Sequence, residues 1–288
     1  MIHQTQNMGC RLVLIAIAWS AALLPLSLLS APGDLYESDL ASGTIFRFAA
    51  DGTQSSFASG LTAPVGLAFD GKGNTFISDV GAGTIVKVAP DGIQSGFAII
   101  PDGPAGLAFD DSGILFVAVF NTGTILNAAG LAIDRDGNLF AADLGGGTIF
   151  KFTTLGIKSV FAAGLSSPAG LAFDSSGNLF ASDNFNGTIY KFTADGTKST
   201  FASGVSGAAG LAFDGAGYLF VASNVDGTIV KFTPGGTKST FALGLSQATF
   251  LAFEPVPQKL LNVSARAFVQ GGDNVLIGGF IVGGNSLL

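Results

Sequence analysis

The chain has 288 residues, with 13 Lys and Arg against 20 Asp and Glu, so its net charge is −7. No basic cluster occurs in the sequence, and nucleic acid is therefore excluded as an expected partner, because neutralising phosphates requires a basic footprint. Gly contributes 42 residues and Phe 26, while only 11% of residues are charged. This composition predicts an apolar-cored β protein and excludes a disordered or coiled-coil chain.

An apolar run, residues 12–29, follows Arg11 near the start of the chain. Segment 1–31 is typical of a secretory signal peptide. An uncleaved signal anchor is the alternative, because about 18 apolar residues just span a bilayer. Either interpretation predicts a secreted, periplasmic or cell-surface protein, with no membrane contact unless the segment is retained. Cys10 precedes the run, so we expect no disulfide in the rest of the chain.

A block of about forty residues recurs through residues 34–254. Its four stretches are clearest at 168–174, 177–183, 187–193 and 197–204. Each unit holds four short apolar stretches separated by Gly and Asp turn signals, which is the pattern of one four-stranded propeller blade. The sequence therefore predicts an all-β chain folded as a β-propeller.

The Gly-Thr-Ile stretch marks the units and gives their number. It recurs with its threonine at Thr44, Thr84, Thr124, Thr148, Thr188 and Thr228. One interval is 24 residues and the other four are 40, so the third unit lacks the residues of an outermost strand and its turn. These spacings predict six blades, of which one, at about 105–128, is truncated.

The two ends of the repeat region complement each other. Residues 34–39 align with a second strand, whereas residues 250–253 align with a first strand. We expect both termini to complete the first blade, which closes the ring and protects its edges. Residues 255–288 break the repeat and are expected to form a Pro-rich linker and an incomplete β tail. This tail resembles the opening of a β-rich module that follows such repeats in bacterial surface and secreted proteins.

Residues 168–196 resemble the NHL repeat, and the similarity covers 34–254. It extends to the SMP-30/gluconolactonase-like propellers, a superfamily that includes metal-dependent lactonases. The resemblance implies metal ligands just before the Gly that opens each innermost strand. The matching positions hold Val65, Ala105, Ala129, Ala169, Ala209 and Thr249. Only Thr249 offers a side-chain oxygen, which hard cations require, so we transfer neither the lactonase activity nor a metal or other cofactor.

Histidine chemistry is also excluded. The only histidine is His3, in the leader, so the repeats offer no Ser/His/Asp triad, Cys/His pair or histidine-ligated zinc. Propeller lyases that rely on histidine are excluded on the same ground. The sequence thus indicates a repeat protein without catalytic residues.

Four aspartates end the second strand of their blades at equivalent positions: Asp39, Asp79, Asp143 and Asp183. One interpretation is a carboxylate ring that binds a cation or a polyhydroxylated ligand. The other, which recurrence favours, is that each carboxylate accepts hydrogen bonds from loop amides. If the ring does bind Ca²⁺ or Mg²⁺, the alternative function is a divergent metal-dependent hydrolase of the SMP-30/gluconolactonase-like class.

Two loops break the near-symmetry of the repeats. One contains Asn184, Phe185 and Asn186, and the other contains Phe120 and Asn121. An exposed aromatic ring flanked by amides can stack on a sugar or a peptide, although loop aromatics also cover the ends of blades. We expect a monomeric, non-catalytic binding or scaffold propeller that recognises a protein or glycan through one face. A vestigial gene product is a further alternative, which the shortened blade and incomplete tail suggest.

Overall fold

The computed structural model describes residues 33–119 and 128–255, together with the backbone of short strands at 2–3, 13–15, 281–282 and 286–287. The chain divides into two compact units, Met1–Glu254 and Pro255–Leu288. In the second unit, β25 (Ile281–Val282) pairs with β26 (Ser286–Leu287). The described parts of both units contain strands and no helix, which confirms the all-β prediction.

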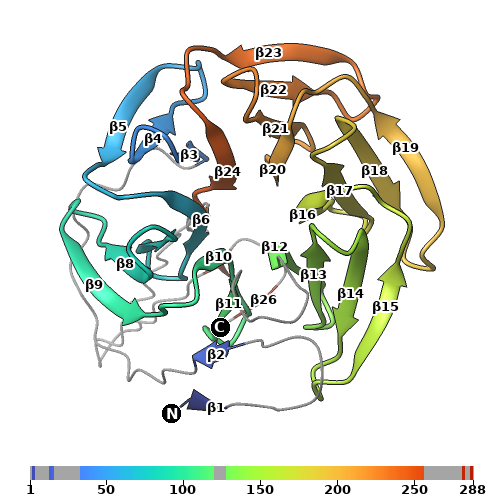
Figure 1. The fold of residues 1–288 in the computed structure, drawn as a ribbon, viewed down its shortest axis with the longest axis horizontal. Coiled ribbons are helices and arrows are strands. Elements are labelled where there is room, and N and C mark those ends of the chain that lie inside the picture. Colours follow the sequence, from blue (N-terminus) through green and yellow to red (C-terminus); the bar gives the residue numbers. More distant parts are fainter. Residues whose placement is uncertain are drawn as a thin grey trace, which may run out of the picture. The chain divides into compact units, whose positions relative to one another are not determined.

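The first unit consists of sheets arranged radially around a common centre (Figure 1). The innermost strands are β6 (Pro64–Phe69), β10 (Pro104–Phe109), β12 (Ala128–Ile133), β16 (Pro168–Phe173), β20 (Ala208–Phe213) and β24 (Ala248–Phe253). The second strands are β3 (Leu35–Asp39), β7 (Thr75–Asp79), β11 (Leu115–Val119), β13 (Leu139–Asp143), β17 (Leu179–Asp183) and β21 (Leu219–Ser223). Neighbouring innermost strands pack against each other around the centre. This arrangement is a β-propeller, as the repeat predicts.

The outer half of each complete sheet has two further strands. The third strands are β4 (Thr44–Phe48), β8 (Thr84–Val88), β14 (Thr148–Phe152), β18 (Thr188–Phe192) and β22 (Thr228–Phe232). The outermost strands are β5 (Gln54–Ala58), β9 (Gln94–Ile99), β15 (Lys158–Ala162), β19 (Lys198–Ala202) and β23 (Lys238–Ala242). All strand pairs within these sheets are antiparallel.

Five complete blades are built from the repeats, one fewer than the six units that the sequence spacing predicts. The described part of the third unit, 104–119, supplies β10 and β11, and β12 of the next blade begins at Ala128. The outer side of β11 pairs with β2 (Val13–Ile15), which in turn pairs with β1 (Ile2–His3). Residues 120–127 of the predicted truncated blade lie outside the described residues.

One sheet joins strands from opposite ends of the repeat region. Its order is β24-β3-β4-β5, and the register pairs Ala248 with Asp39 and Phe253 with Leu35. Strand β24 also packs against β20 on one side and β6 on the other. Residues near 250 and residues near 35 therefore belong to the same sheet.

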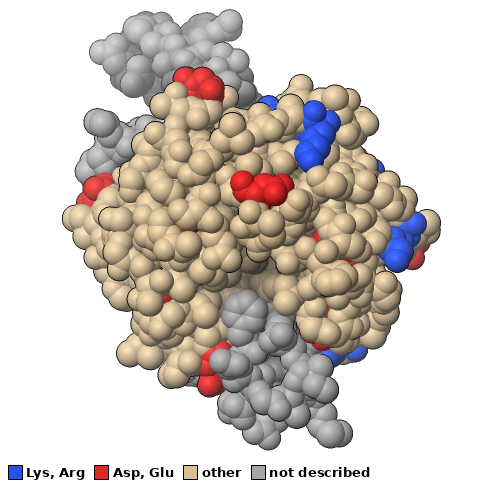
Figure 2. Space-filling model, turned by 45° about the horizontal axis from the view of Figure 1, so that its top comes forward, with Lys and Arg blue, Asp and Glu red and all other residues tan. Residues whose placement is uncertain are grey.

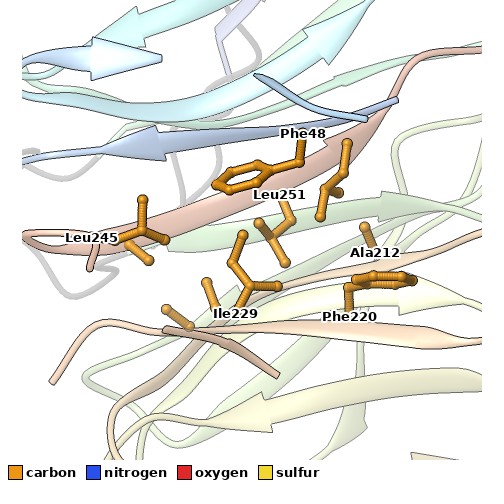
Figure 3. Close-up of a cluster of buried hydrophobic side chains, with 10 residues drawn as sticks. Phe48, Ala212, Phe220, Ile229, Leu245 and Leu251 are labelled. Atoms are coloured by element: carbon orange, nitrogen blue, oxygen red, sulfur yellow. The ribbon is translucent and has the colours of Figure 1, made fainter. Parts of the chain in front are cut away.

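The hydrophobic core lies between neighbouring sheets, which is why the strands are apolar on both faces. In each of five interfaces, one ring packs edge-to-face against two others; Phe180, for example, lies 5.1 Å from Phe201 and 4.9 Å from Phe213 between ring centroids. Figure 3 shows another interface, where Phe48 and Leu251 of one sheet meet Phe220 and neighbouring residues of the next. Such aromatic pairs add roughly 0.5–1.5 kcal/mol beyond the area that they bury.

Glycine sets the close approach of the innermost strands. A Cβ atom added to Gly170 would lie 2.3 Å from the carbonyl oxygen of Ala209 on the next blade. The same clash with a neighbouring backbone recurs at Gly66, Gly106, Gly130 and Gly210. The Gly-Leu-Ala motif of the repeat is therefore needed for packing around the centre.

Candidate functional site

One face of the propeller, here called the loop face, carries two kinds of connection. The turns between second and third strands are 40–43, 80–83, 144–147, 184–187 and 224–227, and the links from an outermost strand to the next blade are 59–63, 100–103, 163–167, 203–207 and 243–247. The two kinds of connection are hydrogen-bonded to each other: the amide of Val205, for example, donates to the carbonyl of Gly187 over 3.1 Å. The loop face is therefore tied to the blades beneath it.

The four predicted aspartates lie under this face with buried side chains. The carboxylate of Asp79 accepts hydrogen bonds from the amides of Thr62 (2.8 Å), Ala63 (2.9 Å) and Ala82 (3.2 Å). This carboxylate thus connects its own turn to the link that enters the blade. An ionised acceptor makes stronger bonds to amides than a neutral one does, which suits a position that fixes two loops at once.

The same pattern holds at Asp183 and Asp39, and Asp143 is bonded to its own turn. Asp183 accepts from the amides of Ser166, Ser167 and Asn186, and Asp39 accepts from those of Ser42, Ser246 and Gln247. Asp143 accepts from the amide of Gly146 over 2.9 Å. Within 33–119 and 128–255 these carboxylates do not gather into a group that could hold a metal ion. The geometry favours the loop-fixing interpretation of the aspartates.

The residues that the lactonase resemblance singles out are buried near the centre. Val65, Ala105, Ala129, Ala169 and Ala209 present only hydrocarbon, and the hydroxyl of Thr249 donates to the carbonyl of Ser38 over 2.7 Å. Hard cations require several oxygen ligands, and these side chains offer one hydroxyl that already has a partner.

The loop of Asn184, Phe185 and Asn186 projects from the loop face. The side-chain amide of Asn184 donates to the carbonyl of Ala208 over 3.3 Å, and the amide of Thr188 donates to the side chain of Asn186 over 3.0 Å. Between these two anchored residues, Phe185 is 84% exposed. A hydrogen-bonded loop therefore presents an aromatic ring to solvent. The other predicted pair, Phe120 and Asn121, lies outside the described residues.

Two further apolar side chains on the loop face were missed by the sequence analysis. Val225 is 72% exposed and takes the position in its turn that Phe185 has in the preceding blade. Leu243 is also exposed, in the link that leaves the same blade. Comparing the turns by position would have revealed Val225, because the equivalent residues are Ala41, Gly81 and Gly145.

Phe185 and Val225 belong to loops that converge on one link. Asn184 reaches Ala208, while a Cβ atom on Gly207 would lie 2.7 Å from Cγ2 of Val225. We call Phe185, Val225 and Leu243 the loop-face patch. Charged side chains are sparse on the surface of the propeller, and Figure 2 shows them scattered among uncharged residues.

Glu37 is a second feature that the sequence analysis did not single out. It is fully buried on β3, where the other second strands carry Ile77, Val117, Ala141, Ala181 and Val221. Its Oε1 accepts from the amide of Thr249 over 3.3 Å, and its Oε2 has no hydrogen-bond partner among the residues described. Burial, and next the charge of Asp39, raise the pKa of Glu37 well above its usual value.

No protein-family model matches this chain, and no curated protein matches it. Solved structures do resemble it. A chain of a nidogen/laminin complex is 18% identical, with a TM-score of 0.66 over 77% of this chain and 98% of that one. A catalytically inactive virginiamycin B lyase from Staphylococcus aureus with quinupristin is 14% identical, with a TM-score of 0.58 over 88% of this chain and 95% of that one.

A calcium-binding protein, regucalcin, from Agrobacterium tumefaciens is 17% identical, with a TM-score of 0.56 over 66% of this chain and 77% of that one. At these identities the likeness is one of fold. The chain is a β-propeller, a fold that serves both binding proteins and enzymes. No helix within the described parts of the chain is long and apolar enough to cross a membrane.

Proposed function

We propose that this chain is a non-catalytic binding or scaffold propeller that recognises a protein or glycan ligand through its loop face. The observation that carries the proposal is Phe185, exposed between two asparagines whose side chains are hydrogen-bonded to the fold. A ring held in place before binding loses little conformational freedom when a ligand packs on it. Aromatic anchors of this kind commonly provide much of the free energy of an interface.

Val225 and Leu243 support this proposal. An isolated exposed apolar residue is ordinary on a protein surface, whereas a cluster of such residues marks an interaction site. Val225 lies beside the same link as the loop that carries Phe185. The amides of Asn184 and Asn186 supply polar groups beside the apolar ones, as sugar and peptide ligands require. We propose a monomeric protein without a cofactor, which binds its ligand at this loop-face patch.

The alternative is a divergent metal-dependent hydrolase that uses the aspartates. The fold of regucalcin, a calcium-binding protein, gives it some support. Against it, the carboxylates of Asp39, Asp79 and Asp183 each accept hydrogen bonds from three amides. The binding proposal requires none of these carboxylates to be released, so we prefer it.

Three further proposals concern the class of the repeat, the closure of the ring and the cellular location of the protein. We propose that the blades are of the NHL type and that the β10–β11 unit counts as a sixth, truncated blade. The pairing of β24 with β3 supports the proposal that the ring is closed by both ends of the repeat region. The apolar run at 12–29 supports a secreted, periplasmic or cell-surface location.

The test compares the wild-type chain with Phe185→Ser on arrays of defined glycans and on a random peptide library. Leu155→Ser is the matched control, because Leu155 is as exposed as Phe185 but lies at a turn on the opposite face. Loss of an aromatic anchor costs 2 kcal/mol or more, so we expect roughly 30-fold weaker binding of selected ligands to Phe185→Ser alone. Equal binding to both variants, or lactone hydrolysis that requires added calcium or magnesium, would overturn the proposal.

A further inference from the structure

The described part of the repeat at 104–119 supplies only two strands, β10 and β11, between two complete blades, and we call the place of the two outer repeat strands the gap. In complete blades the last residue of the third strand is buried against the preceding blade: Phe48, Phe192 and Phe232 are each 1% exposed. Its counterpart Phe152 is only half-buried, and the preceding blade is the one that contains only β10 and β11 of its repeat. The outer part of the β12–β15 blade therefore lacks the cover by repeat strands that the other complete blades have, and β2 and β1 take the place of those strands.

The uncovered surface of this blade is apolar. Phe150 lies on the same side of the sheet as Phe152 and faces Val160 across the β14–β15 pair. Val160 is 61% exposed, whereas the other outermost strands have Ser56, Gly96, Thr200 and Thr240 at this position. Unlike the repeat elsewhere, this blade thus presents apolar residues where it borders the gap.

The turns beside the gap also have apolar residues where other blades have polar ones. Leu155 and Ile157 lie in the turn between β14 and β15 of the β12–β15 blade. The equivalent turn of the next blade has Asp195 and Thr197. On the other side of the gap, the β6–β9 blade exposes Ile93 and Ile99. The described residues with large exposed apolar side chains fall into two groups: the loop-face patch, and those on the two blades that flank the gap.

Aromatic packing is also incomplete at the gap. The five interfaces that contain an outermost strand of the preceding blade each have a ring packed between two others. Phe116 of β11 occupies the position of the central ring, but within the described ranges it has no ring partner and is half-buried. Among the described residues, the interface between β10–β11 and the β12–β15 blade therefore lacks the aromatic pairs that the other interfaces have.

A strand from the start of the chain lies at this edge. Strand β2 pairs antiparallel with β11, and its register aligns Ile15 with Leu115, Leu14 with Phe116 and Val13 with Val117. In the complete blade beside it, Phe152 pairs with Leu139 in the same way. Ile15 thus has the register position that is fully buried in most complete blades, and β1 follows at the position of an outermost strand.

We propose that the outer edge of β11 is a strand-acceptor site and that its occupant is this chain's own segment, Val13–Ile15. An open apolar edge invites pairing with other chains, so filling it from within the molecule protects the propeller. Hydrogen bonds between the two backbones provide the affinity for the added strand. The alternation of its side chains between the two faces of the sheet fixes the register of pairing. In molecules that retain segment 1–31, the N-terminal run then has a structural role, which excludes its use as a membrane anchor in the same molecule. Cleavage of this segment during export would leave the outer edge of β11 open.

The test is disulfide trapping in the full chain, produced without export so that the N-terminal segment is retained. In a Cys10→Ser background, Leu14→Cys is combined with Phe116→Cys, its register partner. Directly paired antiparallel residues lie roughly 4.5–5.5 Å apart between Cα atoms, within the range of a disulfide. The control combines Leu14→Cys with Phe140→Cys, the equivalent position in the neighbouring complete blade.

After oxidation with diamide, peptide mass mapping should find an intramolecular disulfide in the Phe116→Cys protein, at least tenfold above the control. A second measurement follows amide hydrogen exchange of residues 115–117. Leu14→Pro should accelerate exchange of the amides that face away from β10, whereas Ala21→Pro should leave it unchanged. Equal cross-linking at both positions, cross-links mainly between chains, or unchanged exchange in Leu14→Pro would overturn the proposal.

Discussion

Replacing Asp79 with alanine tests whether the buried aspartates fix the loops or serve a ligand. The substitution removes the acceptor of three backbone amides, those of Thr62, Ala63 and Ala82. It leaves the β7 strand intact and changes no residue that reaches the surface of the loop face. A structural role therefore predicts that the variant unfolds more easily. A cation-binding role predicts instead that added calcium or magnesium stabilises the wild type and no longer stabilises the variant.

The expected loss of stability follows from these hydrogen bonds. Bonds to a charged group contribute roughly 1.5–3 kcal/mol each, and an amide left unpaired in a buried site adds a penalty of its own. Because the loop amides are only partly buried, water recovers some of this, and we expect a net loss of roughly 4 kcal/mol. At about 2–4 °C per kcal/mol for a chain of this size, Tm should fall by about 8–16 °C.

The assay is thermal unfolding followed by circular dichroism, with calcium, magnesium or a chelator present. Asp226→Ala is the control, since Asp226 is exposed in the equivalent turn of another blade, and its stability should change by less than about 0.5 kcal/mol. A ligand at 100 times its dissociation constant would add about 2.7 kcal/mol to the wild type. The loop-fixing role is refuted if Asp79→Ala matches the control, or if only the wild type gains stability from a cation.

Two further predictions concern the core. Gly170→Ala should destabilise the propeller by several kcal/mol because its Cβ meets the carbonyl of Ala209, whereas Gly215→Ala, which has open space, should not; chemical denaturation of both variants measures the difference. Glu37 binds its proton more tightly when folded, so stability should be greatest below the unfolded pKa of about 4.3 and fall as pH rises through the raised folded pKa. Glu37→Gln should remove most of this decline, as unfolding midpoints measured across pH will show; an unchanged slope would contradict the argument.

The sequence was sufficient to predict the propeller because the repeat couples three independent signals. Glycine occurs where backbones approach closely, as at Gly170, and Asp and Gly occur where the chain turns. Phenylalanine recurs where sheets pack, as at Phe180. The short interval of 24 residues shows that one repeat lacks strands. Its length does not show which segment of the chain lies beside β11.

The features that the sequence did not reveal are those that depend on three-dimensional neighbours. Glu37 reads as an ordinary surface residue until β24 and β4 are seen to pair with β3 on its two sides. Val225 and Leu243 become a patch only when their loops are placed on the same face as Phe185. The loop-fixing role of the aspartates was favoured from their recurrence, whereas the amides that they bind, more than a dozen residues away, required the fold.

The sheet that joins β24 to β3 also constrains the order of folding. Asp39 is hydrogen-bonded to the amide of Ser246, 207 residues later in the chain. During synthesis, β3, β4 and β5 emerge first, yet their innermost partner is the last strand of the repeat region to be made. The entropy of closing so long a loop is lost before this contact forms, so the sheet should be the slowest to mature. Until then the unpaired edge of β3 is exposed to other nascent chains. The yield of folded protein should therefore depend most strongly on the concentration of unfolded chains just after release from the ribosome.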